Sequence, residues 1–336
     1  MGGGENSPVI DNKAVLHAEQ FIALYHKKVI DKIIFPREIY TASINSLRSL
    51  RRQGVSIRDF CIANRLNEET SLLNFIEPYI SAKYLPYLEF HIADHCNLNC
   101  KACSHYSGLV KEPHFPNLEK FTRDFECLHK FIDDIGKIRI LGGEPLLNPE
   151  INEYIKLTRR LYPYAIIRVV TNAVLLPNMP ESFFETLRKC NAGIDISFYP
   201  PLESKMPAIK RLLEEKEVKF FMYPMIKTFL MRQTLKPHNQ INKIFMECGR
   251  SNCHNLYEGK LSVCSLLFPT KYFNDYYGKN LPMDGAIDLY DASLTTEKLK
   301  ARLLMPLERC RYCTPPVEVE WTTIKNPSPI TDWVHD

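Results

Sequence analysis

The sequence predicts an α/β fold in which a parallel sheet, wound by crossover helices, closes as a partial (β/α)6 barrel. After Pro86, short runs of β-forming residues alternate with amphipathic helical stretches, and the unit repeats at least four times before residue 225. A chain of 336 residues with 45% apolar content is long enough for a large core and for two or three domains. We expect the strands at 87–93, 138–141, 165–171, 193–198 and 218–223.

The first strand is an apolar run from Tyr87 to Ala93, and a helix follows it. That helix is predicted to start near Asn117 and to end at Gly136, because its apolar residues recur at helical spacing and form one core-facing stripe. The stripe consists of Phe121, Phe125, Leu128, Ile132 and Ile135.

The second helix is predicted from its start signal, with Asn148 as the N-cap and Pro149 at the first helical position. Its inward-facing residues are Ile151, Tyr154, Ile155 and Leu161. The third and fourth helices are expected near 181–190 and 203–215.

Residues 1–86 show no chemical motif. The segment 31–36, a helix through about Arg52 and the segment 55–63 suggest a small α/β unit without the G-x-G-x-x-G of nucleotide binding. The densest basic cluster, Arg48, Arg51 and Arg52, lacks interleaved aromatic residues, so we read it as a solvated helix face and expect no nucleic-acid partner. Without an 18-residue apolar run or a signal-peptide core, we expect no membrane association and a cytoplasmic location.

Three cysteines, Cys96, Cys100 and Cys103, follow the first strand with the spacing C-x3-C-x2-C. Three thiolates in one short loop can hold three irons of a four-iron cluster and leave the fourth iron open for a substrate or cofactor. A structural zinc site is the alternative, and it needs a fourth ligand, for which His95 or His105 would serve.

A second motif, Gly142-Gly143-Glu144-Pro145, ends the next strand, where two glycines let backbone approach a ligand beside a carboxylate. An ordinary strand-to-helix turn is the alternative for this motif alone. Together with the cysteines upstream, however, it resembles the radical S-adenosylmethionine (SAM) enzymes over about residues 87–225. The resemblance implies a TIM-like partial barrel, a 4Fe-4S cluster on Cys96, Cys100 and Cys103, and S-adenosyl-L-methionine bound to the open iron and to Gly142, Gly143 and Glu144.

The chain departs from the family at Ala102, where members often carry an aromatic residue. Tyr106 is a partial substitute for stacking on adenine, or else it packs in the loop.

Ligands of such sheets collect at the carboxyl ends of the strands. Thr171-Asn172-Ala173 resembles the Thr-Asn-Gly of many family members, which makes Asn172 a candidate SAM contact. Further candidate ligand contacts are Ser197 and Tyr199, which share a strand face with Asp195, and His91, which shares one with Glu89. Satisfied core polar groups are the alternative for these residues. For Arg139 and Arg168 the sequence leaves two interpretations equally open, namely pairing with carboxylates in the barrel and a solvent-facing or structural role.

A second group of cysteines follows residue 240. Residues 255–263 read as a hairpin turning at Glu258-Gly259, which brings the flanking cysteines together, and a C-x2-C pair follows. This region resembles the twitch form of the SPASM-type auxiliary domain, which implies one auxiliary 4Fe-4S cluster, and zinc is the alternative. Five candidates compete for four places, with Cys253 or Cys248 as the spare: Cys248, Cys253, Cys264, Cys310 and Cys313. We expect Cys61, Cys127 and Cys190 to be small buried hydrophobic residues.

The resemblance implies reductive cleavage of SAM to a 5′-deoxyadenosyl radical, abstraction of a substrate hydrogen atom, and an electron donor of the flavodoxin or ferredoxin type. Oxidation or epimerisation of a hydroxyl on a carbohydrate or cyclitol leads the possible reactions. Maturation of a ribosomal peptide, or a non-catalytic iron–sulfur or zinc scaffold, are the alternatives. We expect three parts: residues 1–86, a core barrel at 87–240, and an auxiliary-cluster domain at 241–336.

Overall fold

The computed structural model describes residues 83–251 and 253–335. The chain divides into two compact units, of which the first comprises Met1–Pro86, Ile132–Lys137 and Tyr164–Ile166 and the second comprises the rest. The elements predicted between 31 and 63, the three arginines among them and Cys61 lie outside the described residues. The division at 86 and 240 stays a prediction.

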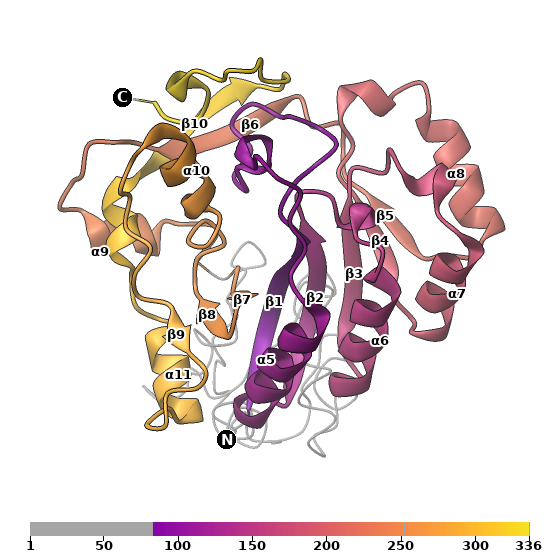
Figure 1. The fold of residues 1–336 in the computed structure, drawn as a ribbon, viewed down its shortest axis with the longest axis horizontal. Coiled ribbons are helices and arrows are strands. Elements are labelled where there is room, and N and C mark those ends of the chain that lie inside the picture. Colours follow the sequence, from indigo (N-terminus) through magenta and orange to yellow (C-terminus); the bar gives the residue numbers. More distant parts are fainter. Residues whose placement is uncertain (1–82, 252, 336) are drawn as a thin grey trace, which may run out of the picture. The chain divides into compact units, whose positions relative to one another are not determined.

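A single sheet of eight strands runs through the described residues in the order β5-β4-β3-β2-β1-β7-β8-β9 (Figure 1). The strands are β1 (Tyr84–Ala93), β2 (Asp134–Gly142), β3 (Ile166–Thr171), β4 (Gly193–Ile196), β5 (Phe220–Met222), β7 (Asn255–Tyr257), β8 (Lys260–Ser262) and β9 (Ile287–Asp288). Pairing is parallel between β3 and β4, β4 and β5, and β1 and β7. The predicted α/β class with a mainly parallel sheet is confirmed, and all five expected strands form.

Helices connect the first five strands, as the periodicity predicts. They are α5 (Leu118–Phe131), α6 (Ile151–Leu161), α7 (Glu181–Lys189) and α8 (Met206–Glu215). The later helices are α9 (Ile241–Met246), α10 (Thr270–Tyr277) and α11 (Thr296–Arg302). Short 3-10 helices occupy Ser107–Leu109, Pro145–Leu147, Leu176–Asn178, Pro200–Leu202, Glu308–Tyr312 and Ile330–Asp332.

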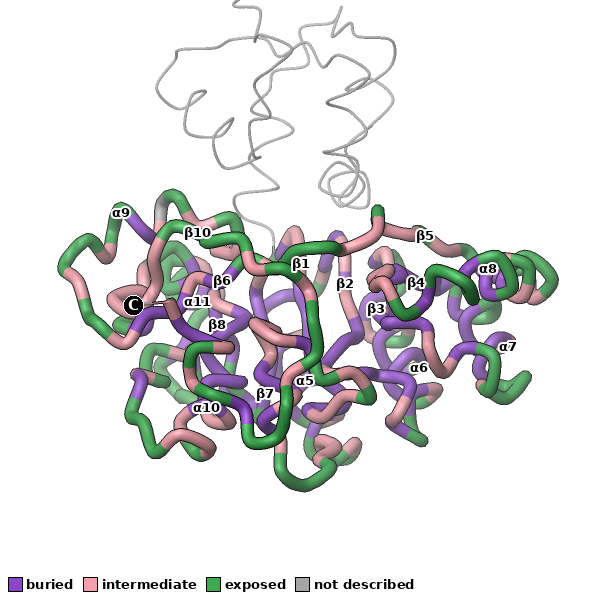
Figure 2. Tube along the Cα trace, turned by 90° about the horizontal axis from the view of Figure 1, so that it is seen from above, coloured by how far each residue is buried: buried purple, intermediate pink, exposed green. Residues whose placement is uncertain are grey.

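Aromatic packing holds α5 and α6 on the sheet. The Phe90 ring of β1 lies 4.6 Å from that of Phe121, 5.5 Å from that of Phe125 and 6.4 Å from that of Tyr154, measured between centroids. All four rings are buried, so the predicted stripes on both helices do face the core. Buried segments follow the inner strands, and exposed ones follow the outer turns of α7 and α8 (Figure 2).

Two predicted helix boundaries are wrong. The first helix ends at Phe131 rather than Gly136, because Ile135 and Gly136 already belong to β2. Ile135 is buried, but as a residue of strand β2. Its distance in sequence from Leu128 and Ile132 happens to fit the spacing of a helix, which explains the error. The second helix begins at Ile151, where Glu150 is the N-cap, because the side chain of Asn148 turns the chain just before it.

The hairpin predicted after residue 254 is confirmed. Strands β7 and β8 pair antiparallel across Glu258 and Gly259, whose φ angles of 48° and 75° are both left-handed. Strand β7 lies parallel to β1, with Asn255 in register with Glu89, so the later part of the chain extends the sheet of the earlier part.

A second sheet pairs β6 (Thr228–Gln233) antiparallel with β10 (Cys313–Glu320). Strands on either side of the predicted boundary at 240 therefore pair twice, β6 with β10 and β1 with β7. Among residues 83–251 and 253–335, no helix combines the length and apolar character that a membrane span requires.

Candidate active site

The three cysteines occupy the loop that leaves the carboxyl end of β1. Burial raises the pKa of Cys100 to about 12, and the neighbouring Cys103 adds to the shift. Burial also raises the pKa of Cys96, to which Glu144, Cys103 and Cys100 contribute. The three thiols thus lie within electrostatic range of one another, and a bound cation would reverse these shifts by stabilising the thiolates.

The two histidines considered as zinc ligands have protein partners at Nδ1. That atom of His95 accepts from the His114 backbone N–H at 3.2 Å, and that of His105 lies 2.8 Å from the Gly142 carbonyl oxygen. Within the described residues, no three His, Cys, Asp or Glu side chains are close enough together to hold a single metal ion.

The Gly-Gly-Glu segment at the end of β2 lies directly against the cysteine loop. Gly143 N–H donates to the Ala93 carbonyl at 2.7 Å, and Glu144 N–H donates to that of His95 at 3.0 Å. A Cβ on Gly142 would overlap the Ala93 carbonyl oxygen, and one on Gly143 would overlap the His95 carbonyl oxygen. The close approach that these glycines permit in the structure is therefore to the backbone of the cysteine loop.

Glu144 is completely buried at this junction. Its Oε1 accepts from Thr171 Oγ1 at 2.7 Å and from Leu146 N–H at 3.0 Å, and its Oε2 accepts from Asn172 N–H at 2.9 Å. Burial raises the pKa of Glu144 to about 7, against the opposing effect of these three donors. A carboxylate has about four acceptor positions, so one position remains for a cationic ligand group.

Asn172, the candidate from the end of β3, also reaches the cysteine loop. Its Nδ2 donates to Asn97 Oδ1 at 2.6 Å and lies 3.7 Å from Cys96 Sγ. The sequence-predicted residues Gly142, Gly143, Glu144 and Asn172 are thus brought together with Cys96.

Tyr199 lies beside the same loop. Burial raises its pKa, and the nearby Cys103, Cys100 and Cys96 raise it further. Ser197 is more distant: its backbone N–H donates to the Thr171 carbonyl at 2.9 Å, and its side chain hydrogen-bonds Tyr199. Ser197 therefore reaches the loop only through Tyr199.

Trp321, for which no sequence motif predicts a role, contacts the cysteine loop as well. Its indole Nε1 lies 3.3 Å from Cys100 Sγ, 221 positions away in the chain. The indole ring stacks on Tyr199 with 5.7 Å between centroids. The chain has two tryptophans, and this rarity is the one feature of the sequence that sets Trp321 apart. It does not indicate where the residue lies in the fold.

The Tyr106 side chain packs in a hydrophobic core. Its side chain is 3% exposed, and its ring packs 5.5 Å from Phe273 and 5.6 Å from Trp333 between centroids. Its hydroxyl donates to Gln233. Of the two interpretations of Tyr106, packing is therefore the one that the structure supports.

A cluster of polar side chains, here called the polar group, lies at the face of β1 that carries Glu89 and His91, and it also includes Arg139 and Asp195. Burial raises the pKa of Glu89, and the hydrogen bond from the Tyr87 hydroxyl and the charges of His91 and Arg139 act against this. Arg139 Nη2 donates to Asp195 Oδ2 at 2.8 Å, and its guanidinium also bonds Tyr223. Arg168 Nε lies 3.5 Å from Asp195 Oδ1, so both arginines pair with a carboxylate.

Two buried nitrogens of this polar group, His91 Nε2 and Arg139 Nε, have no hydrogen-bond partner in the described structure. Buried polar atoms are rarely unpaired, so each one calls for an explanation. A polar ligand over this face of β1 and β2 would supply the missing partners.

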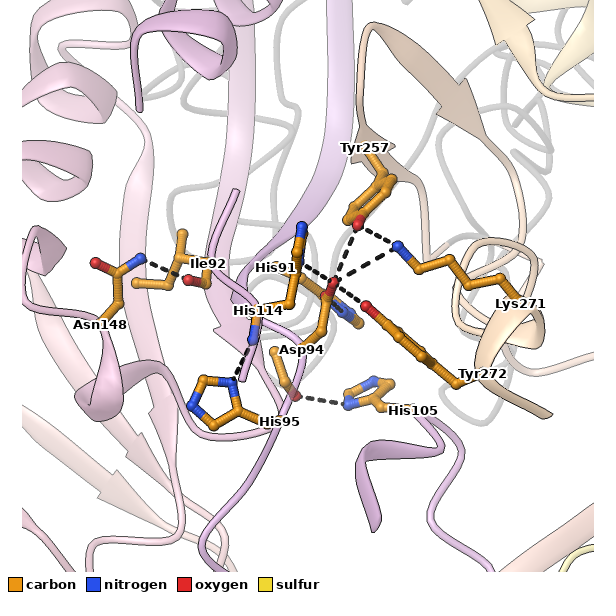
Figure 3. A network of polar contacts seen from close by, with 11 residues as sticks. His91, Ile92, Asp94, His95, His105, His114, Asn148, Tyr257, Lys271 and Tyr272 are labelled. Atoms are coloured by element: carbon orange, nitrogen blue, oxygen red, sulfur yellow. Dashed lines mark hydrogen bonds and ion pairs between the residues drawn. The ribbon is translucent and has the colours of Figure 1, made fainter. Parts of the chain in front are cut away.

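Asp94 ties the cysteine loop to the later part of the chain (Figure 3). Its carboxylate accepts from His114 Nδ1 at 2.7 Å and from the hydroxyls of Tyr257, at 3.0 Å, and Tyr272. Lys271 Nζ adds an ion pair at 3.7 Å. Despite burial, these partners and His91 hold the pKa of Asp94 below its usual range, so it is a fixed anion at the mouth of the loop.

Four of the five later cysteines, Cys248, Cys264, Cys310 and Cys313, line one small pocket. Burial raises the pKa of Cys264 to about 12, and Cys313 adds to the shift. Four thiols around one space are the complete ligand set of a 4Fe-4S cluster, whereas a single zinc ion needs the same four thiols closer together than they lie in the described structure.

Cys253 does not line that pocket. Burial raises its pKa to about 12, helped by Glu89 and opposed by Arg250 and Arg139. Cys253 is within electrostatic range of Glu89, Arg139 and Cys248, and because it does not line the pocket we take it as the spare cysteine. Cys127 and Cys190 are buried, as expected.

Arginines supply positive charge to both cysteine groups. Arg232, Arg250 and Arg309 line the four-thiol pocket. Burial raises the pKa of Cys313 and of Cys103, and the Arg250 guanidinium opposes the shift at both thiols. One side chain is therefore within electrostatic range of both groups, and cations of this kind favour thiolates over thiols.

Comparison with known proteins gives a family match and several distant likenesses. The model of the Radical SAM superfamily matches residues 90–220. The GTP 3′,8-cyclase of Clostridium botulinum (strain Hall) is 32% identical over 111 residues, which is 32% of this chain and 34% of that protein. The enzyme of the same name from Alkaliphilus oremlandii is 32% identical over 117 residues, 34% of this chain and 36% of that protein. The chain thus spans about a third of the length of these curated relatives.

Two solved structures align with parts of this chain. The crystal structure of BtrN in complex with AdoMet and 2-DOIA aligns with a TM-score of 0.44 and 16% identity, over 68% of this chain and 92% of that one. Streptococcus suis SuiB bound to S-adenosylmethionine aligns with a TM-score of 0.35 and 16% identity, over 55% of this chain and 44% of that one. Likenesses this distant do not identify a substrate.

Proposed function

The chain belongs to the radical SAM superfamily, and from this premise we propose that it oxidises a hydroxyl group of a carbohydrate or cyclitol. In the proposal a 4Fe-4S cluster held by Cys96, Cys100 and Cys103 supplies, when SAM is bound, the electron that cleaves SAM to a 5′-deoxyadenosyl radical. Epimerisation of such a hydroxyl is the close variant.

The residues around the cysteine loop have the donors and acceptors that this cofactor pair needs. Glu144, with one acceptor position open, suits the amino group of SAM. Leu98 N–H and Asn172 Nδ2 lie 3.4 and 3.7 Å from Cys96 Sγ, as hydrogen-bond donors to a ligating sulfur should. Trp321 does the same at Cys100.

The gathering of Cys248, Cys264, Cys310 and Cys313 around one pocket is the observation that carries oxidation over the redox-neutral variant. Converting a carbinol to a carbonyl removes two hydrogens. One leaves as a hydrogen atom to the adenosyl radical, and the other leaves as a proton and an electron. Cys248, Cys264, Cys310 and Cys313 would hold a second iron–sulfur cluster, which would be an electron acceptor of the required class.

The substrate class is proposed from the polar side chains that β1, β2 and β4 contribute. Glu89 and Asp195 are acceptors for hydroxyl groups, and the unpartnered nitrogens of His91 and Arg139 are further hydrogen-bonding positions. This combination of carboxylate acceptors and nitrogen atoms suits a ligand with several neighbouring hydroxyls, because each hydroxyl can both donate and accept a hydrogen bond. The GTP 3′,8-cyclase match covers too little of either protein to favour GTP.

The test is anaerobic incubation of the reconstituted enzyme with SAM, a low-potential reductant and a panel of sugars and cyclitols. We expect a product with two hydrogens fewer than its substrate, together with 5′-deoxyadenosine. Cys264→Ser should still cleave SAM and lose the oxidation, whereas Cys253→Ser should retain both. A product isomeric with its substrate would decide for epimerisation, and reaction with peptides alone would contradict the proposed substrate class.

A flavodoxin or ferredoxin is the proposed electron donor, since SAM cleavage consumes an external electron. Residues 87–240 and 241–336 are proposed as the parts that carry the SAM site and the auxiliary cluster. The donor can be tested by replacing the chemical reductant with reduced flavodoxin, which should support turnover.

A further inference from the structure

The segment that begins at Trp321 hydrogen-bonds along the three-cysteine loop. Lys101 N–H donates to the Thr322 carbonyl at 2.8 Å, and Ile324 N–H donates to that of Asn99 at 2.7 Å. Cys100 and Thr323 form an antiparallel bridge between these two bonds. The backbone of the segment is therefore held in register beside Cys100, the middle cysteine.

This register fixes the Trp321 side chain. The Trp321 backbone N–H donates to the Lys227 carbonyl at 2.8 Å, and its ring stacks on Tyr199 with an interplanar angle of 22°. The indole N–H is a donor without acceptor capacity, and the atom it meets is Cys100 Sγ at 3.3 Å. A half-buried, stacked aromatic pair thus orients one N–H bond toward one sulfur.

The other two cysteines receive backbone N–H groups from their own loop, and Cys96 also lies 3.7 Å from Asn172 Nδ2. Leu98 N–H lies 3.4 Å from Cys96 Sγ, and the backbone groups of His105, Tyr106 and Ser107 bond Cys103. Cys100 instead receives the indole of a residue far along the chain. The bond to Cys100 can therefore be removed without changing the cysteine loop.

We propose that Trp321 is a positioning residue that raises the reduction potential of the cluster at Cys96, Cys100 and Cys103 through its hydrogen bond to Cys100. The inference rests on the proposed assignment of that cluster. One-electron reduction adds negative charge that spreads onto the ligating sulfurs, so an N–H donor stabilises the reduced form more than the oxidised form. Hydrogen bonds to cluster sulfurs set reduction potentials in this way.

The test is a redox titration, followed by electron paramagnetic resonance (EPR), of the signal that changes when SAM is added. Trp321→Phe keeps a ring to stack on Tyr199 and removes the N–H, so we expect unchanged iron content and a midpoint potential shifted to more negative values. Trp333→Phe is the matched control, because that indole donates to Ser328 Oγ at 2.9 Å rather than to a sulfur. It should leave the potential where the wild type has it.

A second measurement needs no substitution. With tryptophan labelled by nitrogen-15 at the indole, pulsed EPR of the reduced wild-type cluster should detect a hyperfine coupling to that nitrogen. An unchanged potential in Trp321→Phe, or no coupling in the labelled wild type, would overturn the role of Trp321. Failure of the cluster assignment looks different, since the wild type would then show no SAM-responsive signal at all.

Discussion

Glu144 is a completely buried carboxyl group in the proposed SAM site. Three donors from the chain already bind its oxygens, yet burial dominates and its pKa lies at about 7. Ionisation is thus incomplete near neutral pH unless a positive charge arrives. A ligand ammonium would supply that charge and lower the pKa again.

This balance predicts a pH dependence of SAM binding. Below its pKa of about 7 the Glu144 carboxyl is protonated and cannot pair with an ammonium, so SAM affinity should rise with pH between about pH 6 and 7.5. The limiting slope is about tenfold per pH unit. Equilibrium dialysis under anaerobic conditions measures it, and Glu144→Gln should bind more weakly with a flat profile. Equal slopes in both proteins would assign the dependence to another group.

Adding a methyl group at Gly143 should lower the stability of the protein, whereas adding one at Gly249 should not. Gly143→Ala places a Cβ on the His95 carbonyl oxygen, and separating β2 from the cysteine loop should cost about 2 kcal/mol or more of unfolding free energy. Gly249→Ala is the matched control, because a Cβ there meets no atom within 4 Å. Thermal unfolding of the reconstituted proteins measures both. A Gly143→Ala protein as stable as the control would refute the packing argument.

Among the elements, the β7–β8 hairpin joins the later cysteines to the sheet, since β7 pairs with β1 and Cys264 follows β8. Its turn requires two left-handed residues, and Glu258 is one of them with a φ of 48°. A non-glycine residue without a short polar side chain is strained in that conformation. The backbone conformation of Glu258 in this turn is therefore slightly unfavourable.

Replacing this residue should stabilise the protein. Glu258→Asn gives the Asn-Gly pair that such two-residue turns prefer, and we expect a gain of about 0.5–1 kcal/mol. Gly259→Ala should do the opposite, because its φ is 75° and the new Cβ would lie 2.9 Å from the Tyr290 ring. Unfolding midpoints of the two variants should fall on either side of the wild type. A midpoint for Glu258→Asn below the wild type would contradict this reading of the turn.

For the whole molecule, eight cysteines divide into a group of three, a group of four and one that belongs to neither. Three lie on one loop, four line one pocket, and Cys253 lies outside that pocket, within electrostatic range of Glu89 and Arg139. Two four-iron clusters require about eight irons per chain.

Iron counting separates the groups. After anaerobic reconstitution we expect about eight irons in the wild type and in Cys253→Ser, and about four in Cys264→Ser. Iron and acid-labile sulfide analysis gives these numbers, and zinc analysis shows whether zinc replaces the second cluster. A Cys253→Ser protein with four irons would make Cys253 a ligand and displace one of the four pocket cysteines.

The sequence by itself determined the elements and the local motifs. The spacing of Cys96, Cys100 and Cys103, the alternation of strands and helices and the Glu258-Gly259 turn are all fixed within a few residues, where chain geometry limits the options. The errors at Gly136 and Asn148 also have a local cause, because a buried strand residue and a pre-helix turn can imitate the spacing of a helix.

Only the tertiary structure decided which distant residues meet. Which four later cysteines share a pocket depends on the pairing of β10 with β6 and of β7 with β1, and those pairings join segments far apart in the chain. Trp321 contacts Cys100 for the same reason, 221 positions away in the chain. Tyr106 packs in a hydrophobic core with Phe273 and Trp333, so its ring is not exposed for stacking on adenine. Such contacts follow from burying apolar surface over the whole fold, and the spacing of a local motif does not record them.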